Sequence, residues 1–368
     1  RKPCKKEIAI MFDKVKNIMD LAKSIDFGKL EEISKKVDLG AVMDAVSKMD
    51  DKQLHGLMKM LNPGKEKKEL PPINGDFYDM DSKLNGSDRE LQLKVREFME
   101  VEVKPIVNKY WLRDEFPFEI VPKLAALNIC GYTYEGYGCM GGSSLMEGII
   151  AAEIARVDAS VATFFGVQSG LAMGSIYICG SEEQKQEWLP RMQKMEVIGA
   201  FGLTEPEVGS GAAGGLTTTC KVLQMTRAGV AWMAVGCARG AYENALDYTR
   251  KRKQFGKPIA SFQLIQNHLV EMLSNLTAMQ TLVFRLSELQ DAGQLRDEHA
   301  SLAKVFCSLR TRDIVSKARE VMGGNGILLE YNVARFLADA EAIYSYEGTK
   351  EINSLIVGRS ITGFSAFV

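Results

Sequence analysis

Four short segments carry residue types that bind or transform ligands: LTEPEVGS at 203–210, RKQFGKP at 252–258, GGNG at 323–326 and YEGT at 346–349. Pro206 and the glycines from Gly209 onward oppose regular structure, so we expect the first segment to be an exposed loop whose amides and hydroxyls can meet a ligand. By itself this segment could also be a plain surface loop. A ligand site becomes the better interpretation because three further segments of this kind follow it.

The second and third segments suit a ligand that carries phosphate. Arg252 offers a planar fork of donors that matches phosphate oxygens. Gly323, Gly324 and Gly326 would let the backbone approach a cofactor closely. An arginine flanked by lysines can also be a solvated basic patch, and one GGxG is weak evidence alone. Four such segments in this order favour a binding site.

In order, the segments resemble the series TEPxxGS, RxQFGxP, GGNG and YEGT of the acyl-CoA dehydrogenase and oxidase family. Further matches are EFP at 115–117, GYGC at 136–139 and EIARVDAS at 153–160, which resemble most closely the branch of glutaryl-CoA dehydrogenase and plant short-chain acyl-CoA oxidase. The resemblance extends from around residue 76 to the C-terminus. It implies FAD as the cofactor, an acyl-CoA thioester as the substrate and α,β-dehydrogenation as the reaction.

The same resemblance makes Glu347 the catalytic base, which removes the α-proton while the β-hydrogen leaves as hydride to the flavin. A carboxyl group in an apolar pocket has a raised pKa, which suits it to take a proton that the thioester has made acidic. The alternative is that Glu347 only lies near the start of a helix beginning around Thr349, where the helix dipole favours an acidic group.

The resemblance also implies binding roles for other residues. Those assigned to the cofactor are Leu203, Thr204, Arg252, Gln254, Phe255, Gln263, Gly323, Gly324, Thr349 and Glu351, and the residues from 252 to 263 would hold the FAD diphosphate and adenosine, often across a dimer interface. Ser210, Arg227 and Gly348 would contact the acyl-CoA, although a salt bridge on a helix surface explains Arg227 equally well. A homodimer or homotetramer is the expected assembly.

Amphipathic helices are expected to position these segments. Ser87 with Glu90, and Ser181 with Gln184, form the reciprocal capping pattern of a helix N-terminus. From 264 to 286 an apolar stripe keeps the spacing of a long packed helix: Leu269, Met272, Leu276, Met279, Val283 and Leu286. Strand signals are nearly absent. The predicted fold is therefore mainly α, with an acyl-CoA dehydrogenase-like N-terminal helical domain and a C-terminal four-helix bundle.

The central β-barrel of the family has no counterpart, because residues 215–222 run directly into 223–227, which already match the bundle. Either the protein has lost this domain or the sequence as given omits it. Gly211 also stands where the family has an aspartate. A flavin open on one face would lose apolar contacts and ring hydrogen bonds. The alternative functions are therefore a catalytically inactive structural or accessory subunit of a larger assembly, and a non-catalytic acyl-CoA binder.

The first part of the chain matches nothing in the family pattern. Residues 1–61 are predicted to be an amphipathic helical extension, followed by a linker rich in proline and charge at 62–75. The helical domain would then occupy 76–222 and the bundle 223–368. The extension would either bind a protein partner or pack on itself as a small helical domain.

Composition excludes several classes of protein. Lys+Arg at 46 against Asp+Glu at 47 gives no basic surface for nucleic acid. The seven cysteines form no CxxC pair and the three histidines are far apart, so no metal site is expected. No apolar run reaches the length of a membrane-spanning helix. We expect a mitochondrial location, with the peroxisome as the alternative, although the C-terminal Ala-Phe-Val is not a peroxisomal Ser-Lys-Leu signal.

Overall fold

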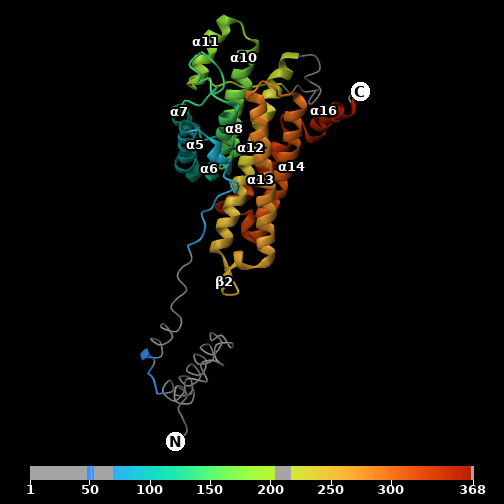
Figure 1. The fold of residues 1–368 in the computed structure, drawn as a ribbon. Helices are drawn as coiled ribbons and strands as arrows, with labels where there is room; N and C mark the ends of the chain where they lie inside the picture. Colours follow the sequence, from blue (N-terminus) through green and yellow to red (C-terminus); the bar gives the residue numbers. More distant parts are fainter. Residues whose placement is uncertain (1–47, 51, 54–68, 204–216, 366–368) are drawn as a thin grey trace. The chain divides into compact units, whose positions relative to one another are not determined.

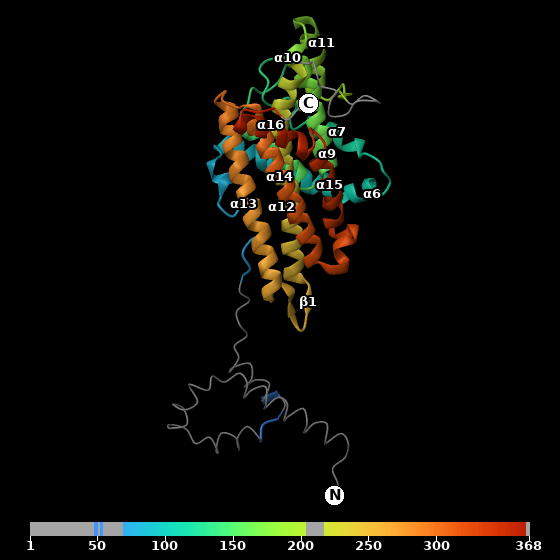
Figure 2. The ribbon, with the colours of Figure 1, turned by 90° about the vertical axis from the view of Figure 1, so that its right-hand side faces the viewer.

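A computed structural model describes residues 48–50, 52–53, 69–203 and 217–365 of the protein. The chain divides into two compact units, Arg1–Pro72 and Ile73–Val368. Most of the predicted extension at 1–61 and the first part of the predicted linker lie outside the described residues. The second unit is an elongated bundle of helices, which Figures 1 and 2 show from two sides.

The helices of this unit are α5 Gly86–Phe98, α6 Lys104–Trp111, α7 Val121–Ala125, α8 Ser144–Ala155, α9 Ala159–Gly166, α10 Met173–Cys179, α11 Glu182–Gln193, α12 Thr217–Lys251, α13 Gln263–Asp291, α14 Asp297–Val321, α15 Val333–Ser345 and α16 Lys350–Thr362. Short 3₁₀ helices lie at Met80–Lys83, Phe118–Ile120, Ile259–Ser261, Gly323–Ile327 and Leu329–Tyr331. The π-helical segments Met99–Val103 and Val167–Ala172 join α5 to α6 and α9 to α10. The strands are β1 Lys253–Gln254 and β2 Lys257–Pro258, which pair antiparallel as a hairpin.

Side-chain caps determine where several helices begin. Ser181 accepts a hydrogen bond from the backbone of Gln184, whose side chain accepts one from the backbone of Ser181, as the sequence predicts. The prediction for Ser87 was wrong, because Asn85 caps α5 by accepting from the backbone N–H of Asp88. Asparagine and serine are about equally good caps, so the helix begins at the first of them that the chain geometry allows.

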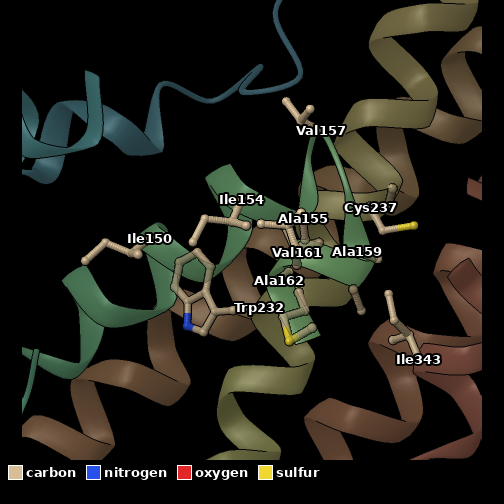
Figure 3. Close-up of a cluster of buried hydrophobic side chains, with 14 of the residues drawn as sticks. Ile150, Ile154, Ala155, Val157, Ala159, Val161, Ala162, Trp232, Cys237 and Ile343 are labelled. Carbon is tan, nitrogen blue, oxygen red and sulfur yellow. The ribbon is translucent and has the colours of Figure 1, made fainter. Parts of the chain in front are cut away.

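The long helices α12, α13 and α14 form the centre of the bundle, and α12 packs against the other two and against α8 and α15. The buried face of α13 contains the predicted stripe Met272, Leu276, Met279, Val283 and Leu286, while Leu269 is half-buried. Figure 3 shows the adjoining core, where Ile150 and Ile154 of α8 lie beside Trp232 of α12. Burying each such large side chain contributes about 1.5–3 kcal/mol.

Glycines on α12 let this helix lie directly against α8. A Cβ atom on Gly236 would come within 2.2 Å of the Ala152 carbonyl oxygen, and one on Gly240 within 2.1 Å of the Arg156 carbonyl oxygen. No side-chain carbon packs that closely, so only glycine permits this contact.

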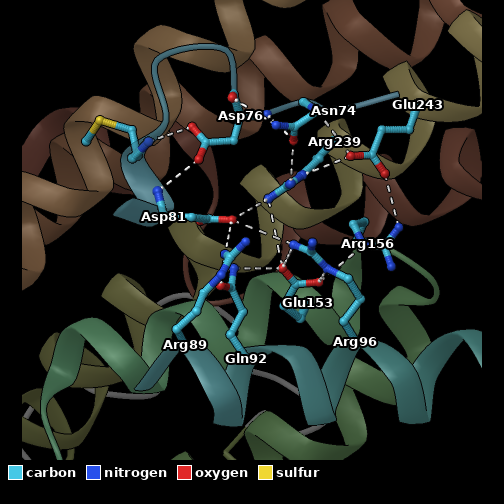
Figure 4. A network of polar contacts seen from close by, with 12 residues as sticks. Asn74, Asp76, Asp81, Arg89, Gln92, Arg96, Glu153, Arg156, Arg239 and Glu243 are labelled. Carbon is cyan, nitrogen blue, oxygen red and sulfur yellow. Dashed lines mark hydrogen bonds and ion pairs between the residues drawn. The ribbon is translucent and has the colours of Figure 1, made fainter. Parts of the chain in front are cut away.

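A buried network of charges fastens α5 to α8 and α12 (Figure 4). Arg96 donates from Nε to Oε2 of Glu153 at 2.9 Å, and Glu243 pairs with both Arg239 and Arg156 at 3.0 Å. Burial by itself would raise the pKa of Glu153, but the hydrogen bond from Arg96 and the charges of Arg239 and Arg156 bring it to about 2. The carboxylate is therefore ionised and matched by partners, as a buried charge must be.

The helix formed by α9, the π segment and α10 spans Ala159–Cys179, with 21 residues and a mean hydropathy of 1.3. By length and composition it could cross a membrane, so the prediction that no apolar run is long enough does not hold here. Of its most apolar stretch of 18 residues, 44% is buried inside the structure, and the helix packs against α8 and α12. A core helix of a bundle has the same composition, and these are the contacts expected of one.

The predicted fold class is confirmed. In the described part of the chain the two-residue strands of the hairpin are the only β-structure, and residues 194–216 connect α11 to α12. The described part of the second unit is therefore mainly α, without the central barrel that the sequence pattern lacks.

Candidate active site

A cavity of about 590 Å³ lies between α8, the α9–α10 helix, the first half of α12 and the loop that joins α15 to α16. Apolar side chains form much of its wall, among them Phe165, Leu171, Leu223, Met225 and Met233. A mostly apolar cavity of this size with a few polar groups is the usual form of a small-molecule site.

Glu347 lies in the wall of this cavity, in the loop between α15 and α16. Its φ is 56° and that of Gly348 is 84°, so two successive residues have left-handed backbone. Thr226 of α12 donates its hydroxyl hydrogen to Oε2 of Glu347 at 3.0 Å. Burial raises the pKa of Glu347 to about 7, although the bond from Thr226 and the charges of Arg227 and Lys304 oppose that shift. The carboxyl group can therefore exchange a proton near neutral pH.

Lys304 of α14 stabilises the loop that contains Glu347 through hydrogen bonds to its backbone. Its ammonium group donates to the carbonyl oxygens of Tyr344 at 2.8 Å and Gly348 at 2.6 Å, and Asn353 donates to the same Gly348 oxygen at 2.8 Å. The Lys304 side chain is fully buried, and burial lowers its pKa to about 8. These donors fix the unusual backbone that presents Glu347 to the cavity.

Lys304 was not predicted from the sequence, although a signal was present. It lies at helical spacing with Ala300, Ala303 and Cys307, which form the buried stripe of α14. A lysine is almost never fully buried unless it is paired, so its place in that stripe indicates carbonyl or carboxylate partners.

The structure places some of the predicted site residues beside Glu347. Leu203, Arg227, Gly348 and Thr349 line the same cavity. Glu351 is exposed in the first turn of α16 and does not line it. Thr204 and Ser210 lie outside the described residues.

Arg227 forms the kind of salt bridge that the sequence left open as the alternative to a contact with the acyl-CoA. It lines the cavity, and its Nη1 atom pairs with Oδ1 of Asp297 at 2.5 Å. Its buried Nε atom has no hydrogen-bond partner in the described structure. This donor has almost no accessible surface, so it is unsatisfied inside the protein rather than open to the cavity.

The other predicted cofactor residues lie at the far end of the bundle. Arg252 directly follows α12, whereas Thr226 beside Glu347 is near its beginning, and a rise of 1.5 Å per residue puts about 40 Å between them. Asn325 donates to the Tyr248 hydroxyl at 2.9 Å, so the GGNG turn lies at this end too. Figure 1 shows the hairpin and α16 at opposite ends of the bundle.

All six residues of this second group are exposed: Arg252, Gln254, Phe255, Gln263, Gly323 and Gly324. Phe255 is 90% exposed, and a Cβ atom placed on either glycine would meet no other atom within 4 Å. Within one chain the structure therefore does not bring them together with Glu347.

The fold and the site together define a class of protein: a bundle of helices with a buried glutamate in the wall of a mostly apolar cavity. Residues 86–196 match the N-terminal domain of acyl-CoA dehydrogenase, and residues 213–362 match its C-terminal domain. This chain belongs to the acyl-CoA dehydrogenase family, as the motifs predict, and FAD is the cofactor of that family.

Individual relatives match about three quarters of the chain. An acyl-CoA dehydrogenase of Bacillus subtilis (strain 168) is 26% identical over 364 residues, covering 73% of this chain and 96% of the relative. A short-chain-specific acyl-CoA dehydrogenase of Clostridium acetobutylicum is 26% identical over 377 residues, covering 77% of this chain and 100% of the relative. The alignment is 364 residues long, but it uses only 73% of the 368 residues of this chain. Part of the relative therefore has no counterpart here.

The fold is also that of solved family members. The glutaryl-CoA dehydrogenase of Mycobacterium smegmatis superimposes with a TM-score of 0.77 and 28% identity, covering 80% of this chain and 100% of that chain. A second structure of a glutaryl-CoA dehydrogenase from that organism is a complex with FADH2.

Proposed function

We propose that this chain catalyses FAD-dependent α,β-dehydrogenation of an acyl-CoA thioester, with Glu347 as the base. The observation that carries the proposal is the position of the Glu347 carboxyl group in an apolar cavity, where burial brings its pKa to about 7. A base with such a pKa is partly ionised at neutral pH and gains a strong affinity for a proton.

The side chains around Glu347 have definable tasks in this reaction. The apolar wall holds the acyl chain and excludes water, and Glu347 takes the proton from the α-carbon. Thr226 orients the carboxyl group through its hydrogen bond. The positively charged Arg227, which lines the cavity, suits an oxygen of the thioester or of the CoA moiety. FAD, when bound, supplies the acceptor for the hydride that leaves the β-carbon.

Residues at the hairpin end of the bundle fit a cofactor that carries a diphosphate. The Arg252 guanidinium is exposed and forms no ion pair with another described residue, and the bare surface at Gly323 and Gly324 leaves room for a close approach. Since about 40 Å separates this end from Glu347 in one chain, we propose that a second copy of the chain supplies it. A homodimer is therefore the smallest assembly expected to complete the site.

The test is acyl-CoA-dependent reduction of the flavin in protein reconstituted with FAD and freed of unbound cofactor. Glu347→Gln should lower the rate of flavin bleaching by about 100-fold or more, because the amide cannot take a proton. Glu187→Gln, at an exposed position on α11 that has no predicted binding role, is the matched control and should keep most of the activity. Protein that binds no FAD on reconstitution would rule the proposal out.

The alternative of an inactive structural subunit gains nothing from these observations. The base and the cavity are both present, and the relatives described here are named as dehydrogenases.

A further inference from the structure

The cavity that contains Glu347 has a second carboxyl group in its wall, that of Glu147 in α8. The proposed dehydrogenation needs one base, and Glu347 supplies it. Glu147 therefore calls for a separate explanation, because an acidic side chain in an apolar cavity is unfavourable without a partner.

Helix capping does not explain Glu147. It lies in the first turn of α8, where the helix dipole favours an acid. However, Asp291 of α13 already accepts from the backbone N–H groups of Ser144 at 2.6 Å and Leu145 at 3.4 Å, and the Ser143 hydroxyl accepts from that of Met146 at 3.1 Å. The N-terminus of α8 thus has its hydrogen-bond acceptors and a counter-charge without Glu147.

The carboxyl group of Glu147 has few hydrogen-bond partners in the described structure. Its hydrogen bond within the described structure comes from the Thr133 hydroxyl at 3.5 Å, the outer limit of such a bond. Burial raises its pKa to about 7, the weak bond from Thr133 opposes this and the charge of Asp291 adds to it. A large share of Glu147 is therefore protonated at neutral pH, and a neutral carboxyl group both donates and accepts hydrogen bonds.

Glu147 and Glu347 belong to different regions of the cavity. The residue after Glu147, Gly148, packs on the indole of Trp232, where an added Cβ atom would lie 2.2 Å from Nε1. Trp232 is six residues after Thr226, the partner of Glu347, which corresponds to about 9 Å along α12. Between them Gly229 leaves the cavity open, since no atom lies within 4 Å of a Cβ placed there.

Other polar side chains gather at the Glu147 region. Ser144, Ser287 and Gln290 line the cavity as well. Ser287 accepts from Trp232 Nε1 at 2.9 Å and lies within 3.5 Å of the Ser144 carbonyl oxygen, so the two serines are neighbours. This polar region, consisting of Ser144, Glu147, Ser287 and Gln290, is a second group of polar side chains in the cavity wall, besides those near Glu347.

We propose that this polar region recognises a hydroxyl group on the distal part of the acyl chain, so that the preferred thioesters are hydroxyacyl-CoA esters of medium length. The inference rests on the proposed function and specifies its substrate class. An extended chain advances about 3.5 Å every three bonds, so the rise of about 9 Å from Thr226 to Trp232 along α12 corresponds to roughly eight bonds. A plain alkyl chain would strip water from Glu147 and leave its hydrogen bonds unmade, whereas a hydroxyl group replaces them.

The test compares dissociation constants by calorimetry on the full chain as purified, with its flavin content measured. The ligands are octanoyl-CoA, decanoyl-CoA and their ω-hydroxy and ω-amino derivatives. The ω-hydroxy ester should bind about ten- to a hundredfold more tightly than its plain partner. Glu147→Leu should abolish this preference, and Glu147→Gln should keep most of it because an amide also donates and accepts. Glu187→Leu, at an exposed position on α11, is the matched control.

The outcomes separate this inference from the proposed function. Equal affinity for plain and hydroxylated esters in the unaltered protein overturns the recognition site and leaves dehydrogenation untouched. Tighter binding of the ω-amino ester overturns it in favour of a cation site. No binding of any thioester overturns both proposals. If Glu147→Leu does not fold, Glu147→Ala replaces it, and a preference for the ω-hydroxy ester that survives this change overturns the role of Glu147.

Discussion

Two features of Glu347 are unfavourable. Its backbone conformation disfavours any residue other than glycine, and its buried surroundings disfavour the ionised carboxylate. A φ of 56° costs a non-glycine residue about 1–2 kcal/mol, and burial raises the pKa of the carboxyl group to about 7. Lys304 and Asn353 offset this by donating to the Gly348 carbonyl oxygen. Strain of this kind persists only where the surroundings impose it, and here it fixes the carboxyl group at the cavity wall.

The hydroxyl group of Thr226 should set the pH at which Glu347 acts. Its hydrogen bond favours the ionised carboxylate and so lowers the pKa of Glu347. Thr226→Val removes that bond, raises the pKa further and should move the midpoint of the pH profile of flavin reduction to higher pH, with a slower rate at neutral pH. Thr226→Ser keeps the hydroxyl and should keep the profile. A profile for Thr226→Val that matches the unaltered protein would show that the bond does not tune the base.

At the residue scale, the sequence predicted the site residues that belong to motifs and missed those that do not. Glu347 was found because YEGT is a local pattern, and its expected burial and raised pKa are present. Glu147 was missed because a glutamate in a first helical turn has an ordinary explanation in the helix dipole. Whether such a side chain faces solvent or a cavity depends on helices distant in the sequence, which no local pattern specifies.

At the scale of elements, the contact between α8 and α12 positions both carboxyl groups, since Glu147 is on α8 and the partner of Glu347 is on α12. Gly236 and Gly240 permit this contact, because a Cβ atom on either would overlap a carbonyl oxygen of α8. The two helices therefore approach at backbone distance, and the position of the cavity depends on these glycines.

Gly240→Ala should destabilise the protein by about 2–3 kcal/mol through overpacking against the Arg156 carbonyl oxygen. This effect is opposite to intrinsic helix propensity, which favours alanine over glycine by about 1 kcal/mol. Gly229→Ala in the same helix is the matched control, because it meets no atom within 4 Å and should be neutral or stabilising. The free energy of unfolding in urea measures both, and equal stability of the two variants would contradict the close contact.

Elements were predictable where their signal is local. The stripe on α13 lies at regular helical spacing and is buried as expected. The start of α5 was misplaced by two residues because Asn85 and Ser87 are competing caps. The π segments in Met99–Val103 and Val167–Ala172 leave no mark in the spacing, since they arise from the fit of the helices to their neighbours.

At the scale of the whole molecule, the sequence indicated the family and the absence of the barrel, but it did not show where the motifs lie relative to one another. The YEGT and RKQFGKP segments are read as one site when they are taken in order. The continuous helix α12, from Thr217 to Lys251, instead separates Arg252 from the neighbourhood of Glu347 by about 40 Å. This separation is the reason for proposing that two copies of the chain bring both groups to one cofactor.

Mixing two inactive variants tests this requirement. In a symmetric dimer each site would take Glu347 from one chain and Arg252 from the other. Co-expressed Glu347→Gln and Arg252→Ala chains then form mixed dimers in which one site carries both substitutions and the other carries neither. Random pairing makes half of the dimers mixed, so about a quarter of the unaltered activity should return, although each variant alone is inactive. If one chain supplied both residues to its own site, every site would contain a substitution and mixing would restore nothing.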